Sequence, residues 1–352
     1  MGTGFPMQRR TLAAFALATV ALVVTARRSR PGFDFRGRNV AIVGGSRGLG
    51  LALAREAAAR GATLAILARS ESELAAARDE LAARGARVVV CSCDIRDDAS
   101  VSEAFAYVAS EVGAIDVLFN VAGIIEVGPV DALRLADYAD AIQTNYLGAV
   151  RAVEAVRPAM QARGAGRIVN VTSIGGKIAV PHLLPYSASK FALVGYSQGL
   201  RAELARFGIV VTTIVPGLMR TGSPPQATFA GRPEVEYAFF APLDALPFTS
   251  VSASHAARAI LAASARGERE RVISPQARFG VTLARVAPGL VAAMLGATAR
   301  LLPGAAGRTE HRRGSASAGA LERAGLGGLG ARERAAQHED LDPEPSMPKG
   351  RT

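Results

Sequence analysis

One segment of this 352-residue chain indicates its architecture: Asn39-Val-Ala-Ile-Val43-Gly44-Gly45-Ser46-Arg47-Gly48-Leu49-Gly50. Its first five residues are an apolar run of strand length, and the alanine-rich residues 51–60 have the composition of a helix. A strand, a glycine-rich turn and a helix in this order are the context of a dinucleotide-binding site. Glycines let the backbone turn tightly and approach a pyrophosphate at the helix N-terminus. The spacing is G-x-x-x-G-x-G, and such a turn alone is also compatible with a plain tight loop.

Six further apolar runs alternate with helical stretches, at residues 63–68, 88–92, 117–121, 167–171, 209–215 and 271–274. Strands that alternate with helices favour a parallel sheet covered on both faces. We therefore predict an α/β fold, a Rossmann-like doubly wound parallel sheet of seven strands with helices on both faces.

The second predicted strand ends at Arg69, where the sequence favours one cofactor over another. An NAD site usually has an acidic residue near this point for the ribose hydroxyl, whereas an NADP site has an arginine for the 2′-phosphate. Residues 62–70 contain no acid, and Arg47 lies in the glycine turn. This favours NADP(H). The alternative is that both arginines are solvated surface residues in a chain that holds 38 of them.

The chemistry is indicated by Tyr186-Ser-Ala-Ser-Lys190, with Ser173 thirteen residues upstream. A tyrosine and a lysine four apart on a helix share one face. An ammonium beside a phenol favours the phenolate, which makes the phenol a usable proton donor and acceptor. The chain has only three lysines, so a lysine here suggests a role that needs a compact, tunable charge. The alternative is an ordinary pair on a helix surface.

Further motifs follow in order along the chain: Cys93-Asp94-Ile95, Asn120-Val121-Ala122-Gly123, Thr144-Asn145-Tyr146-Leu147-Gly148, and Pro216-Gly217 followed by Thr221. Together with the glycine turn, the serine and the tyrosine–lysine pair, they resemble the short-chain dehydrogenase/reductase family in its single-domain form. The resemblance covers about residues 35–278. Two positions depart from the family pattern, with Val43 in place of threonine and Val121 in place of a second asparagine.

The resemblance implies an NADP(H)-dependent enzyme that interconverts a carbonyl and an alcohol. Tyr186 would be the general acid in reduction and the base in oxidation, and Lys190 would bind the nicotinamide ribose. Ser173 would polarise the substrate carbonyl, and Asn145 would hold a water of the proton relay. The implied cofactor-binding residues are Gly44, Ser46, Arg47, Gly48, Leu49, Gly50, Arg69, Asp94, Ile95, Asn120, Ala122, Gly123, Tyr186, Lys190, Pro216, Gly217 and Thr221.

A different class of function stays open, a membrane-bound, non-enzymatic NADP(H)-binding redox sensor or scaffold. Such a protein would have no need for the four catalytic side chains together. A metal enzyme is not indicated, because Cys91 and Cys93 are the only cysteines and two thiolates do not make a zinc site.

Much of the net charge of +11 arises before residue 39, where seven arginines oppose one aspartate. The charge is therefore not a basic face, and we expect no nucleic-acid partner. Within this region, residues 11–26 carry no charge. A helix of this length rises about 24 Å, which spans a ~30 Å hydrocarbon core only with snorkelling or thinning.

The flanks of this apolar run bear on its orientation. Five arginines at residues 27–38, against two before the run, favour a catalytic domain in the cytoplasm. We therefore expect an uncleaved N-terminal membrane anchor. The alternatives are a cleaved secretory signal ending near Ala26 and a twin-arginine export signal at Arg9-Arg10.

We divide the chain into an anchor with its basic flank (1–34), a Rossmann-fold catalytic domain (35–278), an apolar helical segment (279–303) and a disordered tail (304–352). The apolar segment could pack on the domain, cover an oligomer face or lie at a membrane interface. The tail has few large apolar residues to form a core. The family resemblance also implies a homodimer or a homotetramer.

Residues 217–247 are rich in proline and aromatic residues. In the resembled family this stretch forms a mobile lid over the substrate, and lids close to exclude water. The aromatic content suggests an apolar, lipid- or sterol-like carbonyl or alcohol substrate. The alternative is that the rings only pack the lid onto the core.

Overall fold

The computed structural model describes residues 32–245, 250–319 and 331–339. The described residues from Asp34 onward belong to one compact unit. The apolar run at residues 11–26 lies outside the described residues, so the N-terminal anchor stays a prediction.

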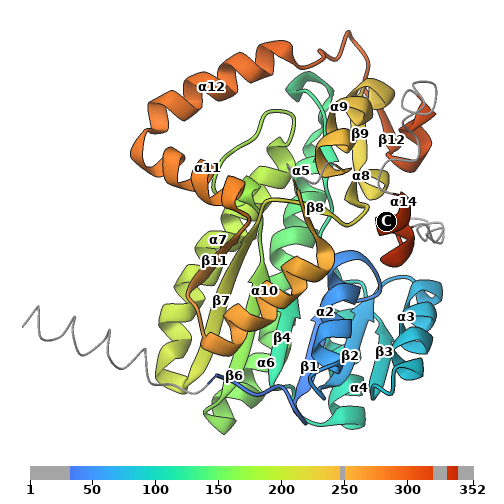
Figure 1. The fold of residues 1–352 in the computed structure, drawn as a ribbon, viewed down its shortest axis with the longest axis vertical. Helices are drawn as coiled ribbons and strands as arrows, with labels where there is room; N and C mark the ends of the chain where they lie inside the picture. Colours follow the sequence, from blue (N-terminus) through green and yellow to red (C-terminus); the bar gives the residue numbers. More distant parts are fainter. Residues whose placement is uncertain (1–31, 246–249, 320–330, 340–352) are drawn as a thin grey trace, which may run out of the picture. The chain divides into compact units, whose positions relative to one another are not determined.

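Seven parallel strands form the central sheet, in the order β11-β7-β6-β4-β1-β2-β3 (Figure 1). Strand β1 pairs with β2 on one side and β4 on the other, and its last four residues are buried. A strand buried on both faces has a continuous apolar sequence, as seen here. The predicted α/β fold is confirmed. The strands are β1 (Asn39–Val43), β2 (Thr63–Ala68), β3 (Val88–Ser92), β4 (Val117–Asn120), β6 (Gly166–Val171), β7 (Ile209–Pro216) and β11 (Glu270–Ile273).

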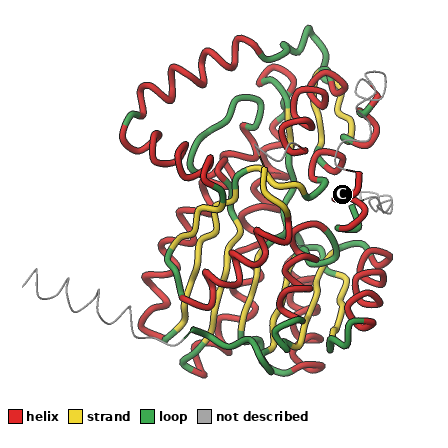
Figure 2. The backbone as a smooth tube through the Cα atoms, viewed as in Figure 1, coloured by secondary structure: helices red, strands yellow, loops and turns green. Residues whose placement is uncertain are grey.

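Helices cover both faces of the sheet (Figure 2). On one face α4 (Asp98–Val112), α6 (Gly148–Arg163) and α7 (Leu184–Leu204) share an apolar core with the strands. On the other face α2 (Gly48–Ala58) packs against α10 (Ala253–Arg266). Helix α3 (Glu71–Ala83) contacts α2 and β3.

Short elements from distant parts of the sequence gather beyond the carboxyl ends of the strands. A three-stranded sheet has the order β12-β9-β5, and a two-stranded sheet pairs β10 with β8. Residues 217–245 therefore contain regular structure, and their role as a lid over the substrate stays a prediction. The elements are β5 (Glu126–Val127), β8 (Leu218–Arg220), α8 (Ser223–Gln226), β9 (Thr228–Gly231), α9 (Pro233–Ala245), β10 (Ser250–Ser252) and β12 (Glu310–Arg313).

The C-terminal region continues with α11 (Pro275–Val286), α12 (Pro288–Leu301) and α14 (Ala331–Ala336). Both β12 and α14 fall within residues 304–352, so the predicted disorder is wrong for these parts. The main chain of β12 finds hydrogen-bond partners in β9, which residue composition alone does not show. In the described part of the chain no single helix meets the length and hydropathy of a membrane span, although α11 and α12, bent by 118°, meet them together.

Candidate active site

The predicted site residues gather at one edge of the sheet, because most of them follow the carboxyl end of a parallel strand. The glycine turn follows β1, Gly123 follows β4, Ser173 follows β6 and Gly217 follows β7. Helix α7 supplies the tyrosine and the lysine, and the turn before α6 supplies Asn145. The fold thus brings residues from between Gly44 and Thr221 to one place, as the motifs predicted.

The glycine-rich turn has no room for a side chain at Gly44 or at Gly50. Gly44 has a φ of +81° and Gly48 a φ of +56°, both in the left-handed region that favours glycine. A Cβ on Gly44 would lie 2.7 Å from the main chain of Ala122, and one on Gly50 would lie 1.8 Å from the Gly44 carbonyl oxygen. Bare backbone at the start of α2 fits a pyrophosphate, which needs close approach to helix N–H groups. Leu49 is buried beneath the turn.

The polar side chains of the turn are held by Glu73, a residue that sequence reasoning missed. Ser46 Oγ donates to Glu73 Oε2 at 2.8 Å, and Arg47 Nη1 lies 3.3 Å from Glu73 Oε1. The carboxylate is buried although its position, the first turn of α3, is an ordinary place for an acid. Only the packing of α3 against α2 distinguishes Glu73 from an ordinary surface acid in the first turn of a helix.

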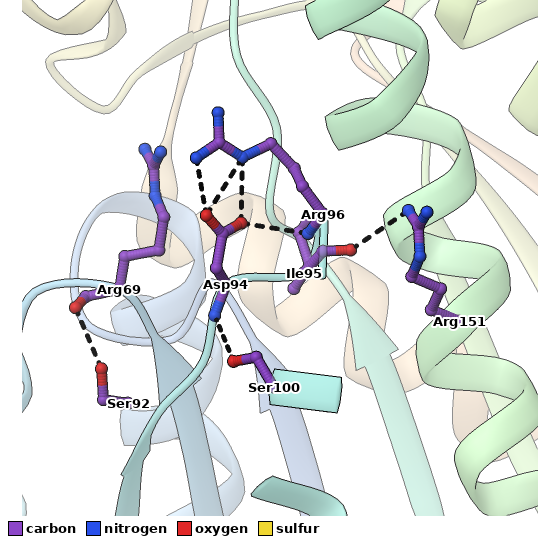
Figure 3. Close-up of polar contacts among 7 residues, drawn as sticks. All are labelled: Arg69, Ser92, Asp94, Ile95, Arg96, Ser100 and Arg151. Carbon is purple, nitrogen blue, oxygen red and sulfur yellow. Dashed lines mark hydrogen bonds and ion pairs between the residues drawn. The ribbon is translucent and has the colours of Figure 1, made fainter. Parts of the chain in front are cut away.

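Four arginines gather where β2 and β3 end. Burial lowers the pKa of Arg69, and the nearby charges of Arg96, Arg47 and Arg313 lower it further. Three carboxylates partly balance these four charges: Asp94 Oδ2 lies 2.6 Å from Arg96 Nη2 (Figure 3), and Glu73 and Glu339 lie near Arg47. The site therefore carries an excess of positive charge, as a phosphate-binding site requires. Arg313 comes from β12, a strand that the sequence did not predict.

The loop after β3 is fixed on both sides (Figure 3). The Asp94 N–H donates to Ser100 Oγ at 3.0 Å, and the Ile95 carbonyl accepts from Arg151 Nη1 at 3.4 Å. The loop is thereby ordered where the family resemblance expects contact with adenine.

Asn145 lies on a π-helical turn, Gln143–Leu147, between α5 (Leu135–Ile142) and α6. Such turns are frequent at functional sites. The side chain is 1% exposed. Its Oδ1 accepts from the Ile124 N–H at 2.8 Å, and its Nδ2 donates to the Ile124 carbonyl at 3.0 Å and to Ser189 Oγ at 2.9 Å. These bonds fix the amide in one orientation, which the motif alone did not reveal.

Lys190 is 4% exposed and donates from Nζ to the Val171 carbonyl at 3.2 Å. Burial lowers its pKa to about 8. A Cβ on Gly123 would lie 2.9 Å from Asn145 Oδ1 and 3.3 Å from Lys190 Nζ. The amide and the ammonium thus converge on the bare backbone of Gly123, which explains why glycine stands there.

Tyr186 and Ser173 face the same small space. A Cβ on Gly175 would lie 3.1 Å from Tyr186 Cε1 and 3.5 Å from Ser173 Oγ. The serine hydroxyl accepts from the Gly175 N–H at 3.0 Å, which leaves its proton for another acceptor. Lys190 Nζ lies 5.7 Å from the centre of the tyrosine ring. The structure therefore brings all four predicted catalytic side chains together.

Three predicted cofactor residues take structural roles as well. Asn120 Nδ2 donates to Asn170 Oδ1 at 2.9 Å, between β4 and β6. Its own Oδ1 is buried and meets no hydrogen-bond donor among the described residues, so one acceptor remains for a ligand. Gly217, after Pro216, donates its N–H to the Ile273 carbonyl at 3.3 Å. Thr221 is buried, and its Oγ1 lies 2.6 Å from Ser223 Oγ.

An apolar cluster lies beside the tyrosine. Its buried members are Val127, Leu183, Ala227, Phe229 and Tyr237, and Tyr186 packs against them. Phe229 meets Tyr237 edge to face, with ring centres 5.4 Å apart, so these rings pack with each other as the alternative had it. His182 Nδ1 lies 2.9 Å from Glu236 Oε2, which ties the loop before α7 to α9.

Among the described residues, no group of three or more His, Cys, Asp or Glu side chains is arranged to hold a metal ion.

Known proteins share this fold and these motifs. The sequence pattern of the family described as short chain dehydrogenase matches residues 38–228. The chain is 35% identical over 278 residues to a dehydrogenase/reductase SDR family protein 7-like of Anopheles gambiae, which covers 76% of this chain and 85% of that protein. It is 37% identical over 184 residues to a putative ketoacyl reductase of Streptomyces coelicolor, covering 51% of this chain and 70% of that one. The chain belongs to the short-chain dehydrogenase/reductase family.

Solved structures agree with this assignment. Actinorhodin polyketide ketoreductase with NADPH superposes with a TM-score of 0.59 at 30% identity, covering 67% of this chain and 95% of that one. A gluconate 5-dehydrogenase of Burkholderia cenocepacia, in complex with NADP and tartrate, gives 0.61 at 28% identity, covering 70% and 98%. The protein is therefore an oxidoreductase of the carbonyl–alcohol type, and the predicted nicotinamide cofactor is confirmed.

Proposed function

We propose that this protein is an NADP(H)-dependent reductase or dehydrogenase of an apolar carbonyl or alcohol, with Tyr186 as the general acid and base. The observation that carries the proposal is the convergence of Tyr186, Lys190, Ser173 and Asn145 around Gly123 and Gly175. We do not favour the non-enzymatic alternative, because the relatives and structures named above carry the names of dehydrogenases or reductases and the proposed catalytic set is complete.

Each side chain has a physical task. Tyr186 gives its phenolic proton to the carbonyl oxygen in reduction and takes a proton in oxidation. Lys190, buried and close to the ring, stabilises the phenolate by its charge. The Ser173 hydroxyl donates to the substrate oxygen, and Asn145 holds the backbone at Ile124 so that a proton path can pass the lysine. The bound nicotinamide supplies or accepts the hydride.

The preference for NADP(H) rests on the four arginines at the ends of β2 and β3. Mutually repelling guanidinium groups raise the energy of the empty site, and a 2′-phosphate would relieve that repulsion. An NAD site would place a carboxylate after β2, where this chain has Arg69.

The proposal of an apolar substrate rests on the cluster beside Tyr186. Its partly buried members include Ile125, Val180 and Phe240, so a substrate that meets these side chains would gain by losing water.

The test is turnover of a panel of apolar ketones, aldehydes and alcohols by the full chain, with NADPH and with NADH. We expect turnover with NADPH that Tyr186→Phe reduces by about 10³-fold while NADPH still binds. Tyr107→Phe is the matched control, because that ring is 47% exposed on α4. Full activity of Tyr186→Phe would contradict the proposal.

We also propose that the chain is held at a membrane with its catalytic domain in the cytoplasm. Residues 11–26 would form the anchor, and α11 and α12 support the idea. Their side chains Phe279, Val286, Leu290, Met294 and Leu301 are each more than half exposed. Residues 271–309 contain five arginines and no acid, which suits an anionic lipid surface.

Cell fractionation tests whether residues 11–26 anchor the chain, and vesicle flotation tests whether α11 and α12 contact a membrane. Leu290→Asp should lower flotation with anionic vesicles, whereas Leu135→Asp, at a site 85% exposed on α5, should not. A mature chain that begins after residue 26 would contradict the anchor and favour export.

Analytical ultracentrifugation of the same variants tests the expected homodimer or homotetramer.

A further inference from the structure

We propose that residues 331–339 are a built-in competitor of the cofactor, which binds across the glycine-rich turn where the pyrophosphate belongs. This inference rests on the family's cofactor site at that turn and is independent of the identity of the substrate. It assigns a ligand function to a segment that the sequence predicted to be disordered.

The segment takes the hydrogen-bonding groups of the turn. The Gly48 N–H, at the start of α2, donates to the Gln337 carbonyl at 2.9 Å. Arg55 Nη1, about two turns further along α2, donates to Gln337 Oε1 at 3.0 Å. The first N–H groups of a helix have no partner within the helix, and they are what a bound phosphate uses. Gln337 therefore occupies a donor that the cofactor needs.

A carboxylate of the segment lies where a phosphate charge would lie. The Glu339 side chain is 6% exposed, and its Oε2 lies 3.8 Å from Arg47 Nε. A Cβ on Gly48 would be 2.5 Å from Glu339 Oε1, so the carboxylate rests on the bare backbone of the turn. A negative charge at this end of α2 is favoured by the helix dipole. The contact is thus chemically similar to a phosphate contact.

The far side of the segment is closed by the residues after β8. Gln226 Nε2 donates to the Glu339 carbonyl at 3.2 Å, and a Cβ on Gly222 would lie 2.7 Å from Glu339 Cβ. His338 Nε2 adds a contact to Glu80 Oε2 at 3.0 Å. In Figure 1 helix α14 (red) accordingly lies beside the start of α2. The segment is seated between the turn and the region after Pro216 that the family uses for nicotinamide.

A pyrophosphate and this segment cannot occupy the same N–H group and the same glycine surface. Cofactor binding must therefore displace the segment. The measured affinity for NADPH is then the intrinsic affinity multiplied by the fraction of molecules in which the segment is away from the turn. A partner or a modification that removed the segment would raise that affinity.

The experiment is an NADPH fluorescence titration of the full chain, of Glu339→Ala and of a chain that stops after residue 330. We expect the Kd for NADPH to fall by at least about fivefold in the shortened chain, and by less in Glu339→Ala. A synthetic peptide of residues 331–345, added in trans, should raise the Kd of the shortened chain again. Glu203→Ala, an exposed acid on α7, is the matched control.

Two outcomes would overturn the inference. A Kd that rises on shortening would show a lid that closes over the cofactor, and an unchanged Kd would show a segment without effect on binding. Hydrogen exchange at Gly48 gives an independent readout, since its amide should lose protection in the shortened chain. Absence of NADPH binding by every variant would contradict the proposed cofactor use as well.

Discussion

The nucleotide end and the substrate end of this active site are built in different ways. The glycine turn comes from one continuous stretch, in which β1, the turn and α2 follow each other within residues 39–58. The proposed substrate end combines β5, β9 and β12, which lie between residues 126 and 313, and β12 also carries Arg313 to the cations near Arg69. The first depends on local backbone geometry, and the second depends on pairing between distant strands.

The two ends also differ in the ionisable groups that they bury. The catalytic corner buries one ammonium, Lys190, next to the Val171 carbonyl. The three-stranded sheet buries a carboxyl group, Glu126, close to Asp137, which in turn meets His311 at 2.9 Å. In the proposed mechanism the buried charge of Lys190 serves chemistry, whereas the proposed mechanism gives the carboxyl group of Glu126 no role.

The largest effect is expected from Lys190→Met. Activity should fall by about 10²–10⁴-fold, the usual contribution of an acid–base partner. The free protein should nevertheless become more stable, because burial lowers the pKa of Lys190 from 10.5 to about 8 and thus disfavours the charged form by on the order of 3 kcal/mol. Steady-state kinetics and thermal unfolding check both parts.

The pH dependence of folding stability provides the control for Lys190→Met. Between pH 8 and 10.5 the unfolded lysine keeps a proton that the folded one has released, so wild-type stability should rise over this range. Lys190→Met should not show the rise. A variant that loses both activity and stability would mean that the lysine is mainly structural.

Gly123→Ala should lower activity by about 10²-fold, because the new methyl group would displace Asn145 and Lys190 by a fraction of an ångström or more. Thermal unfolding measured without NADPH should show that this variant still folds. Gly195→Ala on α7 is the control, since nothing lies within 4 Å of its Cβ. That variant should stay active and gain some helix stability. Equal activity of the two variants would remove the argument for convergence at Gly123.

Arg313→Ala should reduce the preference for NADPH over NADH by about tenfold, the value of one lost charge-assisted contact. The ratio of kcat/KM for the two cofactors measures this effect. Arg78→Ala, an exposed arginine on α3, should leave the ratio unchanged. If Arg313→Ala also leaves it unchanged, the strand β12 contributes nothing to cofactor choice.

The smallest effect is expected from Glu126→Gln, without a change in kcat. Burial and the neighbouring Asp137 raise the pKa of Glu126 to about 8. The folded protein therefore holds a proton that the unfolded chain releases near 4.5, and stability should decline as the pH rises from about 4.5 to 8. The amide variant should lose this decline and melt a few degrees higher above pH 8. A fall in activity would instead assign the carboxyl group a catalytic task.

Much of the catalytic corner could be predicted from the sequence, and the reason is local. Asn39–Gly50 and Tyr186–Lys190 each fix their own geometry, the first by strand, turn and helix, the second by helical spacing. Parallel strands then bring such motifs to one edge without further information. The orientation of Asn145 escaped prediction, because it depends on a π-helical turn and on contacts with Ile124 and Ser189.

The family and the doubly wound sheet could be predicted from the sequence, as could the gathering of Asn145, Ser173, Tyr186 and Lys190, because short-range patterns in a fixed order encode them. Three contacts became visible only in the folded chain: Glu73 holds the glycine turn, Arg313 joins the cations near Arg69, and Glu339 rests on Gly48. Each of these contacts joins residues between 26 and 291 positions apart. Long-range contacts arise from packing and strand pairing, and no local spacing in the sequence encodes them.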